Sequence, residues 1–436
     1  MKASSIDIIK VLKEQGFNAL WAGGCVRDIL IGIKPKDFDI VTDAKPDQVE
    51  ALFDKTIPVG KQFGIIVVDY NSLHFEIATF RKESDYLDGR RPSKVEFTDD
   101  YEDAHRRDFT INGMFFDPLT DEIIDHVGGQ KDIDLQLIKF IGNPEERIQE
   151  DNLRILRAVR FKNTLDFQYD PQTYNAIKSN AHLIQNVSKE RIAAELNKIL
   201  VDKNRAKAID DLEDLGLLDF ILPELKNCMG VAQPKAFHQE GDVYTHILQS
   251  LNSMPENLNL SLYWSVMLHD IGKPQTYTCD DDRIKFNKHA EESARIAESI
   301  LKKYKFSKQF INHVCFLVEK HMSIYQILDM PKKTQIKWFR HLWYLDLLEL
   351  NKYDILGTTP SDLSTYLKIL RLYHETVKDL PAQYPKLVSG LDVMQKLDLK
   401  PGPKVAQILE DIHDLQLEGK ITTTKEALEF IENYKL

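Results

Sequence analysis

Cysteine is scarce in this sequence, and long apolar runs are missing from it. The 436 residues include four cysteines, and no two of them are close along the chain. A disulfide framework of the kind found in small secreted proteins is therefore not expected. No apolar run approaches the roughly 20 residues that cross a bilayer, and the N-terminal residues turn polar and acidic too early for a secretory signal. We expect a cytoplasmic protein that contacts no membrane.

An excess of basic residues is also lacking. The chain has 57 lysines and arginines against 68 aspartates and glutamates, a net charge of −11. This balance argues against a protein that coats nucleic acid through bulk charge, and it is compatible with binding through a local basic surface. The length allows two to four domains, and nothing in the sequence indicates an obligatory protein partner.

A glycine pair follows the first apolar strand pattern. Residues 20–22 form a short apolar run that ends in Gly23 and Gly24, with Arg27 one helical turn further on. Glycine lets a backbone approach a bulky anionic ligand and expose its N–H groups. The arginine adds a fork of donors for phosphate oxygens, so the segment predicts a nucleotide phosphate site.

Two aspartates come next, in a strand-like segment. Asp37 and Asp39 alternate with Phe38 and Ile40, so both carboxylates are expected on the same face of the strand. Such a pair can hold two divalent ions that activate an attacking hydroxyl group and neutralise a leaving pyrophosphate. Glu76, in a later strand pattern, is either a third carboxylate of this site or a charge at a strand edge.

Two further polar segments precede residue 113. The segment 81–92 is rich in charged residues, glycine and proline, and its length predicts a functional loop whose basic residues close over a triphosphate; a merely solvated loop is the alternative. Arg106, Arg107 and Asp108 stand before an apolar run. Their side chains suit a phosphate and a ribose hydroxyl, although such a triplet is a surface ion pair in most proteins.

A helix beginning at Pro144 carries one acidic and three basic residues at intervals of three. Asp151, Arg154, Arg157 and Arg160 form a slanting ridge opposite the apolar face. An aspartate beside an arginine offers an acceptor and a donor, which matches the pairing edges of cytosine and adenine and opposes those of uracil and guanine. Arg157 and Arg160 are then left for the triphosphate. The alternative is a solvated helix face with ion pairs.

Together these motifs resemble, in order and spacing, the bacterial class II tRNA nucleotidyltransferases, or CCA-adding enzymes, which share a superfamily with bacterial poly(A) polymerases. The resemblance is dense over about the first 200 residues. The segments that carry it are Gly23-Gly24-x-Val26-Arg27-Asp28, Asp37-x-Asp39, Arg106-Arg107-Asp108-Phe109-Thr110-Ile111-Asn112, Glu150-Asp151-x-x-Arg154 and Glu190-Arg191-Ile192-Ala193-Ala194-Glu195-Leu196.

The resemblance implies an α+β fold. A head with a mixed sheet of the DNA polymerase β type is expected over residues 1–140, and helical segments over 141–225 (neck), 226–360 (a domain of the HD type) and 361–436 (tail). The implied reaction adds CMP and AMP, from CTP and ATP, to the tRNA 3′ end without a nucleic-acid template. Gly113 departs from the alanine usual in the family, and we expect only a local effect on packing.

The resemblance also assigns roles by position. It implies that Asp37 and Asp39 are catalytic and bind two Mg²⁺ ions. The implied nucleotide contacts are Gly24 and Arg27 for the triphosphate, Arg107 and Asp108 for nucleotide and ribose, Asp151 and Arg154 for the base, and Arg157 and Arg160 beside them. The segment 81–92 resembles a loop that CC-adding enzymes lack, which disfavours CC addition alone. Addition of A alone stays open, because one Asp and Arg pair accepts both C and A.

The second half of the chain resembles the HD phosphohydrolases. His246, the pair His269 and Asp270, and the distant Asp354 have the order of that family's metal ligands, and His289 is also within reach. Histidine and carboxylate suit a divalent transition metal that activates water. A structural role for these histidines is the alternative, and hydrolytic activity stays open.

Two basic runs in this half, 301–305 and 331–340, interleave with aromatic residues. They suit either the tRNA phosphate backbone or a solvated surface above a buried apolar stripe. At the level of the whole chain two hypotheses follow. The first is a nucleotidyltransferase that acts on tRNA, and the second is an HD phosphohydrolase whose N-terminal region only senses nucleotides.

Overall fold

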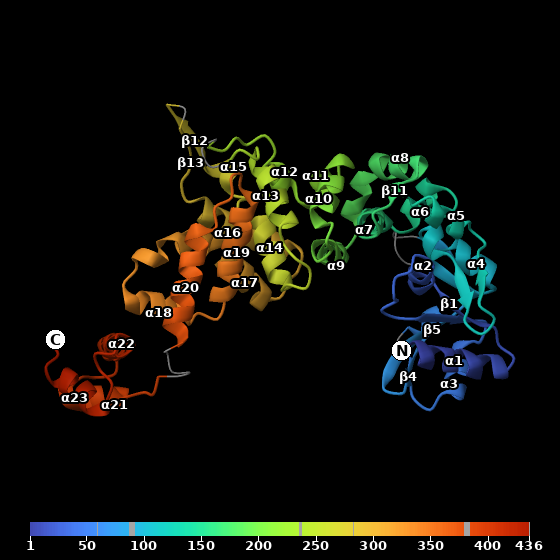
Figure 1. The fold of residues 1–436 in the computed structure, drawn as a ribbon. Coiled ribbons are helices and arrows are strands. Elements are labelled where there is room, and N and C mark those ends of the chain that lie inside the picture. The colour runs from blue at the N-terminus through green and yellow to red at the C-terminus, as the bar shows by residue number, and fades with distance from the viewer. Residues whose placement is uncertain (59, 87–91, 235–237, 282, 379–383, 436) are drawn as a thin grey trace. The chain divides into compact units, whose positions relative to one another are not determined.

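The computed structural model describes residues 1–58, 60–86, 92–234, 238–281, 283–378 and 384–435. The chain forms two compact units. The first is Met1–Lys226 with Pro255–Asn257 and Lys303–Lys305, and the second is the rest of the described chain. Figure 1 follows the elements from the N-terminus to the C-terminus. The four-part division given above stays a prediction.

A seven-stranded mixed sheet forms the base of the first unit, with the strands in the order β3–β4–β5–β2–β1–β8–β9. β2 and β5 are parallel, and the other neighbouring strands are antiparallel. The strands are β1 (Ala19–Ala22), β2 (Asp39–Thr42), β3 (Thr56–Ile57), β4 (Ile65–Tyr70), β5 (Leu73–Thr79), β8 (Phe115–Asp117) and β9 (Glu122–Ile124). The predicted α+β head with a mixed sheet is confirmed.

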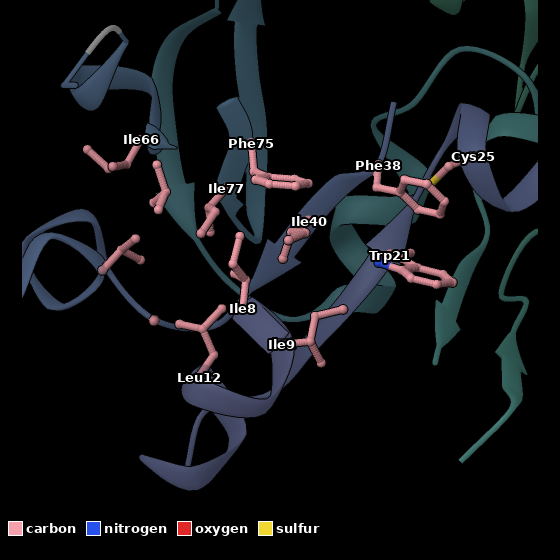
Figure 2. Packing of buried hydrophobic residues seen from close by; sticks show 14 of the residues in the cluster. Ile8, Ile9, Leu12, Trp21, Cys25, Phe38, Ile40, Ile66, Phe75 and Ile77 are labelled. Atoms are coloured by element: carbon pink, nitrogen blue, oxygen red, sulfur yellow. The ribbon is translucent and has the colours of Figure 1, made fainter. Parts of the chain in front are cut away.

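One face of this sheet is covered by α1 (Lys2–Glu14) and α3 (Pro46–Leu52), both of which contribute to one buried cluster. Figure 2 shows the packing of this cluster, in which apolar residues of α1 meet side chains from β1, β2, β4 and β5. The labelled residues are Ile8, Ile9, Leu12, Trp21, Cys25, Phe38, Ile40, Ile66, Phe75 and Ile77. Their burial fixes the register of the central strands, because a slip by one residue would expose the whole set.

The other face of the sheet carries acidic side chains. Because side chains alternate along a strand, Phe38 and Ile40 enter the core while Asp37 and Asp39 stay exposed. The same alternation in β5 buries Phe75 and Ile77 and exposes their neighbour between them. Acidic residues of two adjacent strands therefore share a face of the sheet.

The segment 81–92, predicted as a loop, instead begins and ends in strands. β6 (Arg81–Tyr86) and β7 (Pro92–Phe97) form an antiparallel two-stranded ribbon. Residues 87–91, at the centre of the predicted loop, lie outside the described residues. The loop was predicted from the polar composition of the segment. Composition does not report the backbone pairing between its two ends, which forms the ribbon in the described part.

Gly113 lies where a side chain would be crowded. A Cβ atom on it would come within 2.8 Å of Val127 Cγ2 and 2.9 Å of Ile141 Cδ1. These two side chains fill the space that an alanine methyl group would take, so the departure at this position is a local matter of packing.

Helices complete the first unit, together with short pieces of sheet. After α2 (Gly24–Leu30), α4 (Asp100–His105) and α5 (Gly129–Asp134), the two-residue strands β10 (Leu137–Ile138) and β11 (Gln168–Tyr169) pair in parallel. The remaining helices are α6 (Pro144–Glu150), α7 (Arg154–Leu165), α8 (Pro171–Ser179), α9 (Lys189–Leu200), α10 (Arg205–Asp214), α11 (Leu218–Ile221) and α12 (Pro223–Lys226), and short 3₁₀ turns are η1 (Lys61–Phe63), η2 (Thr110–Asn112) and η3 (Ala181–Asn186).

The second unit is largely helical, as predicted. One exception is the hairpin of β12 (Tyr277–Asp280) and β13 (Arg283–Phe286). Its helices are α13 (Val243–Asn252), α14 (Leu260–Leu268), α15 (Lys273–Thr276), α16 (His289–Lys303), α17 (Lys308–Lys320), the 3₁₀ segment η4 (His321–Asp329), α18 (Lys332–Phe339), α19 (Tyr344–Gly357), α20 (Ser364–Lys378), α21 (Gly390–Leu397), α22 (Pro403–Leu417) and α23 (Thr424–Glu432). The last three share a core of their own. Among the helices of the described residues, none combines the length and apolar character that a membrane span needs.

Candidate functional sites

Three carboxylates face a cavity of about 730 Å³ in the first unit. Asp37, Asp39 and Glu76 all line it. Asp39 opens β2, and the parallel pairing of Ile40 with Ile77 sets Glu76 beside it on the next strand. The sequence left the role of Glu76 open, and the structure brings it to the same cavity as the predicted pair.

This concentration of negative charge changes the acidity of Asp39. Partial loss of solvent around the carboxyl group inside the cavity, followed by the charges of Asp37 and Glu76, raises the pKa of Asp39 to about 6, although Arg107 opposes the shift. Arg107 therefore compensates the negative charge around Asp39 only in part. Hard oxygen donors of this kind suit Mg²⁺ or Mn²⁺.

The glycine pair stands at the start of α2, where Gly23 has a φ of 71°. A side chain there would be strained, and its Cβ would lie 2.9 Å from Arg107 Nη1. Glycine therefore allows that arginine to approach the turn. Arg27, in the same helix, donates from Nη1 to Asn112 Oδ1 at 2.7 Å and from Nη2 to Asp28 Oδ1 at 2.7 Å.

Arg106 and Arg107 share one buried carboxylate. Asp103 accepts from Arg106 Nε at 2.9 Å and from Arg107 Nε and Nη2 at 3.1 and 3.0 Å. Burial alone would raise the pKa of Asp103, but the two guanidinium groups hold it below its usual value. The paired arginines are thereby held in place, and both line the cavity.

Asp108 is buried and has several hydrogen-bond partners within the protein. It accepts from Asn112 Nδ2 at 3.1 Å and from Arg157 Nε and Nη2 at 2.7 and 2.5 Å. Burial alone would raise its pKa, but the charge of Arg157, the Asn112 hydrogen bond and the charge of Arg154 lower it to about 2. The group is therefore an ionised acceptor at neutral pH.

The single helix predicted from Pro144 through Arg160 is wrong in one respect. α6 ends at Glu150, Asp151 has extended backbone angles, and α7 begins at Arg154. The Asp151 carboxylate accepts from the Leu153 backbone N–H, a local bond by which aspartate competes with helix continuation. Asp151 therefore lies just before α7 rather than within one continuous helix.

Asp151 and Arg154 are each held by other groups. Arg191 on α9 donates to both Asp151 oxygens, at 3.0 and 2.7 Å, which is the bidentate geometry that fixes a carboxylate most firmly. Arg154 donates to Glu150 at 2.6 Å and to the backbone oxygens of Arg147 and Arg106 at 2.9 and 3.0 Å. Both side chains line the cavity.

α9 presents a charged face that the sequence analysis did not assign. Arg191, Glu195 and Lys198 recur at the spacing of one helix face. Glu195 accepts from Arg160 Nε at 2.6 Å and from Lys198 Nζ at 2.9 Å. These charges recur at helical spacing, and Arg191 and Glu195 are opposite in sign to their partners beside and on α7. This complementarity is the signal from which the charged face could have been predicted.

Three arginine side chains lie close to the aromatic ring of Phe161. Arg160 lies 4.1 Å from its ring centre, Arg27 5.0 Å and Arg157 5.3 Å. Such cation–π contacts fix the direction of the charged heads. Phe161 lines the same cavity and is another residue to which the sequence motifs assigned no role.

All ten residues predicted for the nucleotidyl transfer site line this one cavity. They are Gly24, Arg27, Asp37, Asp39, Arg107, Asp108, Asp151, Arg154, Arg157 and Arg160. The cavity thus places carboxylates from β2 and β5 together with arginines from α2 and α7.

A separate group of histidines and aspartates lies in the second unit. His246 Nε2 is 3.2 Å from His269 Nε2 and 3.1 Å from Asp354 Oδ1, and Asp270 Oδ2 is 3.4 Å from His269 Nε2. The structure brings together all four residues predicted from the HD resemblance. His246, His269 and Asp354 could hold a metal ion as one group.

Two further histidines join this cluster. His289 Nε2 lies 3.3 Å from Asp270 Oδ1, and His289, His321 and Asp270 form another group that could hold a metal ion. His321 was not singled out from the sequence, because no short motif surrounds it. Lys273, one turn after Asp270, places its Nζ 2.6 Å from Asp270 Oδ2 and donates to Gln233.

The two basic runs of the second half place exposed lysines beside buried apolar residues. In 331–340, Ile336 and Phe339 are buried, while Lys337 is exposed and pairs with Asp414 at 2.6 Å. In 301–305, Lys302 pairs with Glu298 at 2.7 Å and Lys305 with Glu190 at 2.6 Å. Protein carboxylates thus engage several of these lysines.

Three family models match the chain in succession. They are described as "Poly A polymerase head domain" over residues 19–139, "Probable RNA and SrmB- binding site of polymerase A" over 166–229, and a tRNA nucleotidyltransferase domain 2 over 286–431. The order agrees with the head and helical regions seen in the structure.

Whole-length relatives extend this result. A CCA-adding enzyme of Bacillus pumilus is 32% identical over 98% of this chain and 95% of its own length, and one of Ligilactobacillus salivarius is 32% identical over 99% and 95%. The solved structure of the Bacillus stearothermophilus CCA-adding enzyme in complex with CTP matches with a TM-score of 0.72 and 26% identity, covering 98% of this chain and 96% of that one.

Proposed function

Because the chain belongs to the family of CCA-adding enzymes, we propose that it adds CMP and AMP, from CTP and ATP, to the 3′ end of tRNA without a nucleic-acid template. The observation that carries this proposal is the single cavity lined by the three carboxylates of the sheet and by the arginines of α2 and α7. We place the reaction in the cytoplasm, with no obligatory protein partner.

Asp37 and Asp39 are the proposed ligands of two Mg²⁺ ions. Their fit rests on the exposed carboxylates of one strand face and on the raised pKa of Asp39, which indicates that neighbouring negative charge outweighs the effect of Arg107. When bound, such ions activate the tRNA 3′ hydroxyl group and neutralise the leaving pyrophosphate. Glu76 adds negative charge beside them.

Residues around the glycine pair are the proposed contacts for the phosphates and the sugar of the nucleotide. Gly24 and Arg27 bind the triphosphate, and Arg107, held by Asp103, adds a guanidinium group close to Gly23. Asp108 accepts a hydrogen bond from the ribose, since its low pKa keeps it ionised. Arg157 and Arg160, fixed over Phe161, complete the positive side of the cavity.

Asp151 and Arg154 are the proposed base-reading pair. An acceptor and a donor side by side complement the pairing edge of cytosine or adenine. Uracil and guanine would leave buried groups unpaired, which is a strong form of rejection. The bidentate grip of Arg191 on Asp151 supports this role, because a fixed acceptor discriminates better than a mobile one.

The experiment is elongation of tRNAs that end before the first C, after one C and after two, each with one labelled nucleotide at a time. We expect CTP alone to extend the first by two residues, ATP alone to extend the third by one, and neither UTP nor GTP to be used. Use of ATP alone on the third tRNA, with no use of CTP, would instead establish an A-adding enzyme.

A second candidate function is metal-dependent hydrolysis of a phosphate ester at the histidine cluster. The convergence of His246, His269, Asp270 and Asp354 favours it. His and carboxylate ligands suit a divalent transition metal, which supplies an activated water. Water adds to phosphorus, the ester P–O bond breaks, and the leaving oxygen takes the proton.

The test is release of phosphate from a chromogenic phosphate monoester with Mn²⁺, Co²⁺ or Ni²⁺. We expect turnover that is lost in His269→Gln, while the same variant still elongates tRNA. Absence of turnover with every metal would remove this second function and leave the first intact.

A further inference from the structure

Lys198 differs from the other cations of the head cavity in its exposure to solvent. It lies on α9 and lines the cavity together with six arginines. Its side chain is 56% exposed, whereas the arginine side chains are between 9 and 31% exposed. Among the described residues, Glu195 is its one hydrogen-bonding partner, at 2.9 Å. Because an ammonium group has three N–H donors, two of them are available to a ligand.

Glu195 links Lys198 to one of those arginines. This buried carboxylate accepts from Arg160 Nε through Oε2 and from Lys198 Nζ through Oε1. Burial alone would raise the pKa of Glu195, but the charge of Arg160 and the hydrogen bond from Lys198 hold it below its usual value. Two positive groups thus share one negative group, and a net positive charge is left over at this end of the cavity.

α9 places Lys198 away from the residues proposed to read the base. Arg191, Glu195 and Lys198 share one face of the helix, and Arg191 holds Asp151. A helix rises by about 1.5 Å per residue, so the Lys198 backbone lies about 10 Å further along α9 than that of Arg191. The ammonium group is therefore linked to Arg160, through Glu195, and not to the reading pair.

The proposed reaction brings two phosphate-bearing substrates to this cavity. The arginines assigned to the incoming nucleotide are held by acceptors of the protein itself, as in the pairs of Arg107 with Asp103 and of Arg157 with Asp108. The tRNA 3′ end grows by one nucleotide at each addition, so the phosphate that faces a given point of the cavity changes. Lysine suits such a ligand better than a fixed guanidinium group, because it is a point charge on a flexible stem.

We propose that Lys198 binds a backbone phosphate of the single-stranded 3′ end of the tRNA, next to the growing terminus, and that Glu195 orients its ammonium group. This rests on the proposed function and adds a contact for the second substrate, to which the sequence motifs assign no residue of the cavity. Phosphate contacts set the position of a nucleic acid and carry no base information. Lys198 therefore acts on tRNA binding and not on base choice.

The test compares Lys198→Gln with the parent chain in elongation of a tRNA that ends before the first C. We expect kcat/KM for tRNA to fall about fivefold, as for the loss of one exposed ion pair. The slope of log(kcat/KM) against log[KCl] should become shallower by about 0.7, the contribution of one phosphate contact on a single strand. The KM for CTP at saturating tRNA and the preference for CTP over UTP should stay unchanged.

Lys207→Gln is the matched control. Lys207 is also an exposed lysine of a helix with a carboxylate partner, Asp166 at 3.3 Å, but it does not line the cavity. We expect the parent values in this control. Lys198→Arg keeps the positive charge and should recover most of kcat/KM for tRNA. Circular dichroism reports whether each variant is folded, and Lys198→Met, which keeps an apolar stem, replaces Lys198→Gln if that variant does not fold.

A modified substrate locates the contact. A methylphosphonate replaces each of the last three linkages of the tRNA in turn and removes the charge of that phosphate. On the parent chain we expect one of these replacements to lower kcat/KM about fivefold. On Lys198→Gln the same replacement should lower it no further, because the two changes remove the same interaction.

The outcomes distinguish this contact from the proposed function. A raised KM for CTP with an unchanged kcat/KM for tRNA would assign Lys198 to the triphosphate and overturn the inference. Parent values for both substrates, or additive effects of Lys198→Gln and every methylphosphonate, would show a merely solvated lysine and overturn it too. In each of these cases the parent chain still elongates tRNA, and the proposed function stands. A parent chain that elongates no tRNA would remove both.

Discussion

The two candidate metal sites of this molecule differ in almost every physical property. The head cavity offers exposed carboxylates on a sheet face, and the described residues that line it include no histidine. The cluster of the second unit is buried and combines four imidazoles with two carboxylates. One site is built from hard oxygen donors and the other mainly from nitrogen.

This difference indicates how each site acquires its ions. Exposed carboxylates bind Mg²⁺ weakly and share it with the phosphates of a substrate, which suits a head that must release pyrophosphate after every addition. Buried imidazoles hold a transition metal tightly, so we expect an ion bound by the cluster to stay there between turnovers. The comparison predicts exchangeable ions in the head and resident ions in the second unit.

The largest expected effect is at the head carboxylates. Asp39→Ala removes a proposed ligand of both ions, and several kcal/mol of transition-state stabilisation go with it. We expect CMP and AMP addition to fall by about 10³-fold or more, measured as the single-turnover rate on labelled tRNA. Asp54→Ala, at an exposed carboxylate outside the cavity, should keep the full rate. Retained activity in Asp39→Ala would place the metals elsewhere.

Removal of metal by a chelator should lower the thermal stability of the second unit and leave that of the head unchanged. A resident ion at 1,000 times its dissociation constant stabilises the fold that binds it by about 4 kcal/mol. Prolonged dialysis against a strong chelator is therefore expected to lower the unfolding temperature of the second unit, followed by calorimetry, and to leave that of the head unchanged. A shift confined to the head would reverse the assignment of the resident metal.

Substitutions at the junction between α6 and α7 should change the preference of the enzyme among nucleotide bases. Arg154→Gln keeps a donor but loses the charge and the shape of the guanidinium group. We expect the preference for CTP over UTP to drop by about 10²-fold, since the discrimination rests on paired polar groups. The ratio of kcat/KM values on a tRNA ending before the first C measures it.

Arg191→Gln provides a graded comparison for the same readout. It releases Asp151 from its bidentate partner without touching the proposed donor. We expect a smaller loss of discrimination, about tenfold, because only the fixation of the acceptor is weakened. An unchanged preference in both variants would rule out base reading at this junction.

The smallest effect concerns pH and the metal-free head. The folded protein raises the pKa of Asp39 to about 6, so the ionised group opposes folding above that pH, and the opposition disappears as the pH falls through 6 toward 4. Asp39→Asn should therefore stabilise the metal-free protein at pH 8. We expect about 1 kcal/mol, because the exposed group is screened by solvent.

This stability difference is measured by urea unfolding at pH 8 and pH 4 in a chelator. At pH 4 the two proteins should be equally stable. Mg²⁺ should reverse the order at pH 8, since only the wild-type head keeps both carboxylates. If the wild-type protein were more stable than Asp39→Asn at pH 8 without metal, the proposed destabilising effect of the ionised Asp39 carboxylate would be wrong.

Much of the head site could be predicted because its chemistry lies in short local motifs. Strand alternation placed Asp37 and Asp39 on one face, and helical spacing brought Arg154, Arg157 and Arg160 to one cavity. The helix break at Asp151 was missed, because it depends on a local hydrogen bond to Leu153. Helical periodicity alone does not reveal such a bond.

The remaining partners come from distant parts of the chain. Arg191 pairs with Asp151 between α6 and α7, Glu195 pairs with Arg160 of α7, and Phe161 contacts Arg27 of α2. No single-segment pattern expresses such contacts. In the second unit the His269 and Asp270 motif was visible, but His321 comes from η4 and joins the cluster only through the tertiary packing of the helices.

The most direct test of the central claim is a crystal structure of the full chain with Mn²⁺ and a non-hydrolysable CTP analogue. We predict anomalous peaks beside Asp37 and Asp39 under the triphosphate, and a cytosine edge within hydrogen-bonding distance of Asp151 and Arg154. A nucleotide in the cavity with its base turned away from that pair, or with no manganese at the two aspartates, would contradict the account.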